Sequence, residues 1–215
     1  MSIRNLRPVK PTIPSDLAQT LGIKGVQIIL ILIRDAYSDL LSLQCITSGM
    51  DENDITEEWF VCLQLHWRKT DISLVPIHEK GDKTNQKSKR GKPPTVDCCF
   101  RHQWHKHSYF GIECKLIEAN NKILCDKYIT NGVDRFLDCR YSSNCSQGAV
   151  LGYIRQTICL DVATNIEERL TQLSGNPSLN KTQQLLPFEE HYTSVHHRTA
   201  CISPFTLHHF LLSFN

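Results

Sequence analysis

The sequence predicts an α/β or α+β fold in which helices cover both faces of a central sheet. Two helical patterns come first, followed by strands that alternate with further helices, an order that suits a mixed sheet with helices on both faces. The chain has 215 residues, of which 40% are hydrophobic and 21% charged, as in an ordinary globular domain. We expect one compact domain, with an N-terminal arm and core helix in residues 1–50 and the main domain in residues 51–215.

The N-terminal part predicts an arm followed by a buried helix. Its prolines make residues 1–16 an extended arm, and residues 25–46 form an apolar helix. Arg34, Asp35 and Asp39 interrupt the apolar run, which therefore falls short of the about 20 residues that a membrane span requires. We expect a core helix and no membrane association.

A second helix is predicted over residues 54–68, with Asp54 or Thr56 as its N-cap. Glu57 and Glu58 then fall in the first turn, where the helix dipole favours acidic side chains. The inward stripe consists of Ile55, Trp59, Cys62, Leu63, Leu65 and His66.

The remaining elements follow from alternation and apolar periodicity. Strands are predicted at 71–78, twice within 95–118, at 147–155 and at 191–198; helices are predicted at 126–141 and 161–173. Residues 205–214 fit either a strand or a short helix.

Residues 80–94 form a basic loop with six Lys or Arg side chains, although the whole chain carries a formal net charge of only +2. Such a run is commonly a solvated loop. Because this one directly precedes Asp97, it can also hold substrate phosphates. The side chains in question are Lys87, Lys89, Arg90 and Lys92.

The cysteines predict buried apolar thiols in a reducing cytoplasm. The N-terminus lacks the apolar segment of a signal peptide, and the ten cysteines include no Cys-x-x-Cys pair. Cys139 and Cys145 are six apart without a histidine at zinc-finger spacing, which argues against a structural zinc site.

The stretch from Thr95 to Glu118 contains the main candidate catalytic and metal-binding residues. Alternation along a strand puts Glu113 and Lys115 on one face, and Asp97 lies on the preceding strand. Asp97, Glu113 and the backbone carbonyl of Cys114 supply the oxygen ligands that Mg²⁺ or Mn²⁺ prefers, and Lys115 is placed to polarise a water. The alternative is an ion pair at a strand edge.

This pattern resembles the PD-(D/E)xK nuclease superfamily, in residues 55–160. The resemblance implies a restriction-endonuclease-like central mixed sheet flanked by helices, and a Mg²⁺-dependent endonuclease with Asp97, Glu113 and Lys115 at its catalytic centre. Val96 stands where the family pattern has proline. The segments GIECKLIE, KYITNGVDRF and GAVLGYI also resemble bacterial nucleases of phage defence and restriction loci.

Many members of this superfamily add a glutamate from the first core helix. Glu58, Glu57 and Glu52 are the candidates here, and Glu58 is chosen, although the first-turn acids also suit the helix dipole. On the helix after the site, Tyr128, Gly132 and Arg135 share a face, and Tyr128 and Arg135 are predicted to contact a nucleic-acid backbone. Core packing of Tyr128 and a surface ion pair of Arg135 fit the same positions.

Two histidine groups are left open. His102, His105 and His107 lie in the turn between the two site strands, where a solvated turn and a metal site are both compatible with the spacing. His196 and His197 in the tail carry no assignment.

The resemblance therefore implies a DNA-cleaving effector of an anti-phage defence or restriction system, working with partner proteins in a multi-subunit complex. Self-association stays open. Two other functions fit the same residues: a non-catalytic nucleic-acid-binding or assembly subunit, and a nuclease toxin that acts on RNA, since a basic loop does not distinguish the sugar.

Overall fold

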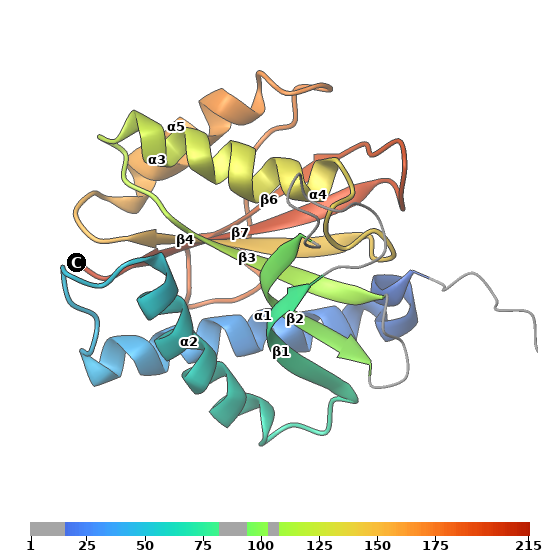
Figure 1. The fold of residues 1–215 in the computed structure, drawn as a ribbon, viewed down its shortest axis with the longest axis horizontal. Coiled ribbons are helices and arrows are strands. Elements are labelled where there is room, and N and C mark those ends of the chain that lie inside the picture. Colours follow the sequence, from blue (N-terminus) through green and yellow to red (C-terminus); the bar gives the residue numbers. More distant parts are fainter. Residues whose placement is uncertain (1–15, 82–93, 103–107) are drawn as a thin grey trace, which may run out of the picture.

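The computed structural model describes residues 16–81, 94–102 and 108–215, which contain a seven-stranded mixed sheet with helices on both faces. Figure 1 shows α1 and α2 on one face and α3, α4 and α5 on the other. The predicted α/β class is confirmed.

The strand order is β1-β2-β3-β4-β7-β6-β5. The strands are β1 (Leu74–Gly81), β2 (Thr95–His102), β3 (Tyr109–Leu116), β4 (Gln147–Ile154), β5 (Asn180–Lys181), β6 (His191–His196) and β7 (Phe205–Ser213). The first three strands pair antiparallel, β3 pairs parallel with β4, and β4 pairs parallel with β7. The open question about residues 205–214 is answered by β7, a central strand. Its length and its burial on both faces are those of a sheet interior.

Helix α1 (Leu17–Leu43) begins well before the predicted start at residue 25, because Asp16 caps its N-terminus by accepting a hydrogen bond from the Ala18 amide. Gly22 (φ 66°) kinks the helix. Among the described residues α1 is the one helix long and apolar enough to cross a membrane, and Ile29, Ile33 and other side chains along one side of it are buried in the core.

Helix α2 (Glu52–Trp67) begins at Glu52 and not at the predicted residue 54. Asp51 caps the helix, and a reciprocal hydrogen bond from the Asp51 amide to the Asp54 carboxylate completes a capping box. The predicted inward stripe is wrong at Leu65, which is exposed, and at His66, which is half-buried and pairs with Asp39 at 2.7 Å.

The predicted helix at 126–141 is a continuous helical run in three parts. It comprises α3 (Lys122–Lys127), the π-helix η1 (Tyr128–Val133) and α4 (Asp134–Leu137). A Cβ atom added at Gly132 would make ordinary contact, at 3.5 Å, with the Lys115 side chain. This glycine therefore faces the lysine of the candidate site. Helix α5 (Cys159–Leu170) covers the same sheet face.

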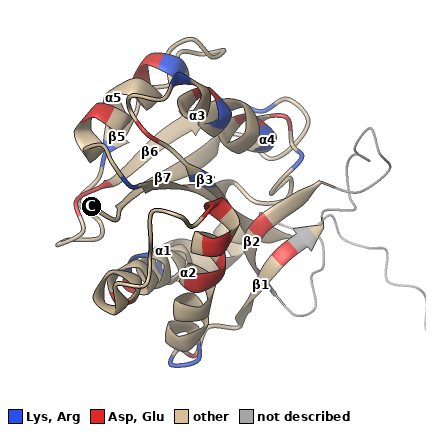
Figure 2. Cartoon of the chain, turned by 60° about the vertical axis from the view of Figure 1, so that its left-hand side comes forward, with Lys and Arg blue, Asp and Glu red and all other residues tan. Residues whose placement is uncertain are grey.

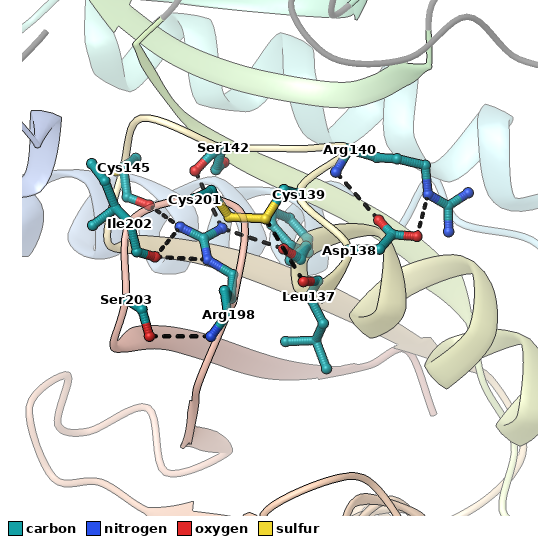
Figure 3. Close-up of a disulfide and its surroundings, with 11 residues drawn as sticks. Leu137, Asp138, Cys139, Arg140, Ser142, Cys145, Arg198, Cys201, Ile202 and Ser203 are labelled. Atoms are coloured by element: carbon teal, nitrogen blue, oxygen red, sulfur yellow. Dashed lines mark hydrogen bonds and ion pairs between the residues drawn. A yellow bond between two sulfur atoms is a disulfide. The ribbon is translucent and has the colours of Figure 1, made fainter. Parts of the chain in front are cut away.

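The expectation that the cysteines are free thiols is wrong for one pair, because Cys139 and Cys201 form a disulfide (Figure 3). The buried Arg198 guanidinium joins the same loops: it donates hydrogen bonds to four backbone carbonyls and stacks 3.9 Å from the Phe205 ring centroid. The carbonyls belong to Phe136, Ser142, Cys145 and Ile202. The segment after α4 is therefore held to the segment before β7 by a disulfide and by the hydrogen bonds of Arg198.

Candidate active site

Strands β2 and β3 bring three of the predicted site residues together. The antiparallel register pairs Cys98 with Ile112, which puts Asp97 and Glu113 one residue further along neighbouring strands. Asp97 Oδ2 accepts a hydrogen bond of 2.7 Å from the Cys114 amide. The carboxylate of Asp97 is thereby fixed against β3, beside Glu113 and Lys115.

The Lys115 ammonium lies at the centre of the site. Its Nζ is 2.8 Å from Glu52 Oε1, 3.1 Å from Glu113 Oε1 and 3.7 Å from Asp97 Oδ2, and it also donates to the carbonyl of Cys114. Burial alone would lower the pKa of Lys115, but the three carboxylates outweigh it and hold that pKa above its usual range. The side chain is therefore charged, and three acids and one carbonyl share its charge.

Glu113 is completely buried. Burial raises the pKa of its carboxyl, the negative charge of Asp97 raises it further, and Lys115 and Arg135 act in the opposite direction. Oε1 contacts both cations, whereas Oε2 has no hydrogen-bond partner among the described residues. A buried oxygen without a partner is costly, so a ligand for it is expected when the site works.

Burial also raises the pKa of Asp97, again against the influence of Lys115. Shifted pKa values of neighbouring carboxyls are frequent at functional sites.

Glu52 is the glutamate that the first core helix contributes, and the choice of Glu58 was wrong. Glu52 Oε1 accepts from Lys115 Nζ, and Oε2 accepts from the Leu116 amide at 2.8 Å. Glu58 and Glu57 are both exposed, further along α2. The physical reason is the cap: because Asp51 starts the helix, the first helical residue is Glu52, which lies against the end of β3.

Arg135 forms a second support for Glu113. Its Nη1 lies 2.8 Å from Glu113 Oε1 and donates a hydrogen bond to the Tyr141 hydroxyl. That hydroxyl in turn donates to the Thr95 carbonyl at 2.6 Å. Sequence reasoning missed Tyr141, since nothing in the order of the residues indicates that the segment after α4 returns to the start of β2.

A pocket of about 380 Å³ opens beside Lys115, between the start of α2 and the helical run α3-η1-α4. Figure 2 shows acidic residues on α2 and basic residues on α3 and α4. The lining consists of Asp51, Glu52, Asn53, Lys115, Leu116, Leu124, Lys127, Asn131 and Arg135.

The predicted nucleic-acid contacts divide into three groups. Arg135 lines the pocket, as a contact to substrate requires. The prediction that Tyr128 contacts nucleic acid is wrong. Its side chain is fully buried, and its hydroxyl lies 3.0 Å from His209 Nδ1 on β7, so Tyr128 is a core residue. Lys87, Lys89, Arg90 and Lys92 lie outside the described residues, as do His105 and His107.

Within the described parts of the chain, no three His, Cys, Asp or Glu side chains are grouped so that they could hold a metal ion. The Lys115 ammonium lies among the acids of the site. The donor set still suits Mg²⁺ or Mn²⁺. Asp97, Glu113 and the Cys114 carbonyl all offer the oxygen atoms that these cations prefer, and Oε2 of Glu113 needs a partner.

Comparison with known proteins returns no match: no protein-family model, no curated protein and no solved structure is similar to this chain at a significant level. The resemblance to the PD-(D/E)xK superfamily therefore stays a prediction from the sequence. The arrangement around Lys115 has to carry any functional conclusion.

Proposed function

We propose that the chain is a divalent-metal-dependent nuclease that hydrolyses phosphodiester bonds of DNA. One observation carries the proposal: the Lys115 ammonium is surrounded by Asp97, Glu113, Glu52 and the Cys114 carbonyl, and Lys115 and Glu52 line the pocket. A strand-edge ion pair needs one acid, whereas three acids around one lysine are a costly arrangement that function can explain. The order of β1, β2, β3, the helical run and β4 supports the resemblance to the nuclease superfamily.

Asp97, Glu113 and the carbonyl of Cys114 would hold the Mg²⁺ or Mn²⁺. Bound there, the cation would lower the pKa of a water and neutralise negative charge on phosphate. The other groups of the proposed site are side chains of this protein.

Lys115 would stabilise the negative charge that develops during hydrolysis. Its three donors point to Glu52, Glu113 and the Cys114 carbonyl. Next to a phosphodiester, the positive charge of the ammonium would offset the negative charge that develops as water adds to phosphorus and the ester oxygen leaves. Glu52 holds the ammonium in place from the α2 side. Arg135 keeps the buried Glu113 carboxylate oriented from the opposite side.

The proposed place in an anti-phage defence or restriction system, with partner proteins, rests on the sequence resemblance alone. DNA is the proposed substrate class in that setting, and RNA is a separate arm of the test below.

The test is cleavage of duplex DNA, single-stranded DNA and RNA by purified protein with Mg²⁺, with Mn²⁺ and with a chelator. We expect metal-dependent cleavage that falls at least about 100-fold in Lys115→Ala and Asp97→Asn. Glu52→Gln should lose activity, while the matched control Glu58→Gln keeps it, since Glu58 is exposed on the same helix.

Equal cleavage by the wild type, Lys115→Ala and Asp97→Asn would refute the assignment. Cleavage of RNA alone would move the substrate from DNA to RNA and leave the site unchanged. Metal-independent binding to DNA without cleavage of any substrate would favour a non-catalytic subunit.

A further inference from the structure

The pocket wall formed by the helical run carries three polar side chains at intervals of four residues: Lys127, Asn131 and Arg135. We call these three residues the helical wall. In a regular α-helix, with about 3.6 residues per turn, side chains four positions apart are rotated by about 40°, so a row of three turns away from a straight line. The π-helix Tyr128–Val133 has a wider turn, which reduces this drift. The irregular turn therefore keeps all three side chains on the pocket.

The helical wall has unused hydrogen-bonding capacity. In residues 16–81, 94–102 and 108–215, neither the Lys127 ammonium nor the Asn131 amide has a hydrogen-bond or ion-pair partner. Arg135 makes its contacts to Glu113 and Tyr141 through Nη1. The donors along this wall are therefore free to bind a ligand that accepts hydrogen bonds.

The opposite wall is already satisfied. The Asp51 carboxylate accepts hydrogen bonds from the amides of Asn53 and Asp54, and the Glu52 carboxylate accepts from Lys115 and the Leu116 amide. The acids are used within the protein, whereas Lys127 is not. Among the described residues Lys127 has no acidic partner, so an anion is favoured beside it on the helical side, whereas the Asp51 and Glu52 carboxylates keep the start of α2 negative.

The pocket dimensions limit the shape of the anion. About 380 Å³ is near the lower end of small-ligand pockets and takes one or two nucleotide units, but not a duplex. Lys127 and Arg135 are eight residues apart, about 12 Å along the helix, and the neutral donor Asn131 lies between them. Two cations separated by a neutral donor suit successive phosphates of one strand.

We propose that the helical wall binds the phosphodiester backbone of a single strand next to the bond that is cleaved, so that the enzyme acts on single-stranded ends or flaps. The substrate part of this inference rests on the proposed function, and the binding part does not. Lys127 and Asn131 are then binding residues that position the strand over Lys115.

Binding is tested without catalysis, by fluorescence anisotropy of a short labelled single-stranded DNA oligonucleotide with full-length protein in a chelator. We expect Lys127→Glu to weaken binding about tenfold and to lower the salt dependence by about one ion, because one phosphate contact is lost. Asn131→Asp should weaken binding in the same direction. The matched control is Lys122→Glu, which makes the same charge change on the exposed first turn of α3, away from the pocket lining; it should bind as the wild type does.

Wild-type affinity in both Lys127→Glu and Asn131→Asp would overturn the inference, and so would an equal loss in Lys122→Glu. Duplex of the same sequence that binds as tightly as the single strand, with the same sensitivity to Lys127→Glu, would overturn the single-strand assignment. An RNA oligonucleotide of the same sequence identifies the preferred sugar. If these binding results are obtained while no substrate is cleaved, the proposed function is refuted, and the inference that the helical wall binds a single strand is retained.

Discussion

Acidification should destabilise this protein because histidines are buried without charge in the sheet. His191, His196, His208 and His209 on β6 and β7 are all almost completely buried. Desolvation lowers the pKa of His191 and His196 to about 4, and that of His208 to about 3. Arg198 lowers the pKa of His196 further. Burial lowers the pKa of His209 well below its usual value, and His196, His208 and His191 lower it further.

The sign follows from proton uptake. An unfolded histidine has a pKa of about 6.5, so below that pH the unfolded chain binds protons that the folded chain does not, and acid favours unfolding. Each histidine whose folded pKa is about 4 lowers the unfolding free energy of the protein by about 2 kcal/mol at about pH 5. His191 and His196 together therefore lower it by about 4 kcal/mol. That is a large part of the 5 to 15 kcal/mol typical of a domain. The loss that His191 and His196 cause should begin below about pH 6.5 and level off below about pH 4.

The raised pKa of Glu113 contributes in the opposite direction, since its folded carboxyl binds a proton more readily than the unfolded one. A pair of variants separates the two effects. His196→Gln keeps a partner for Ser194, which lies 2.7 Å from the His196 ring, but cannot titrate. His197→Gln, at the exposed neighbouring position, is the matched control.

The assay is urea unfolding between about pH 7 and pH 5. We expect the wild type and His197→Gln to lose several kcal/mol, and the pH dependence of His196→Gln to be smaller by about 2 kcal/mol. Stability that is unchanged or higher at pH 5, or equal pH dependence in His196→Gln and His197→Gln, would refute the reasoning.

Two further predictions concern the segment after α4. The disulfide between Cys139 and Cys201 closes a loop of 62 residues, so Cys139→Ala with Cys201→Ala should lower the unfolding free energy by roughly 4 kcal/mol, measured by urea unfolding of oxidised protein; a loss below about 1 kcal/mol would contradict this. Tyr141→Phe removes the hydroxyl that joins Arg135 to the Thr95 carbonyl and should cost about 1 kcal/mol in the same assay. If the proposed function holds, Tyr141→Phe should also lower kcat with little change in KM, and an effect on KM alone would argue against a positioning role.

The local part of the site was predictable because it depends on neighbouring residues. Strand alternation predicts that Glu113 and Lys115 share a face, and the antiparallel pairing of β2 with β3 brings Asp97 beside them. Their contacts in the structure agree with that expectation.

The glutamate from the first helix was not predictable from the same rules. Asp51 and Asp54 are both good N-caps, and only the reciprocal capping box determines that the helix starts at Glu52. A shift of two residues in the start of a helix changes which acid reaches β3.

The remaining errors come from contacts that are distant in the sequence. The helix pattern around Tyr128 is compatible with a surface position, but the Tyr128 hydroxyl contacts His209 on β7 in the core. Cys139 and Cys201 pair across 62 residues, and connectivity of this kind is not encoded in spacing.

The position of β7 has a consequence for the order of folding. β7 follows β6 in the chain but lies between β6 and β4, so β6 cannot join the sheet until β7 is in place. Strands β1 to β4 are neighbours in both sequence and space, and they and the helices next to them carry Glu52, Asp97, Glu113, Lys115 and Arg135. Because contacts close in sequence form fastest, the candidate active site is expected to assemble early, and the sheet is completed when β6 and β5 add to β7.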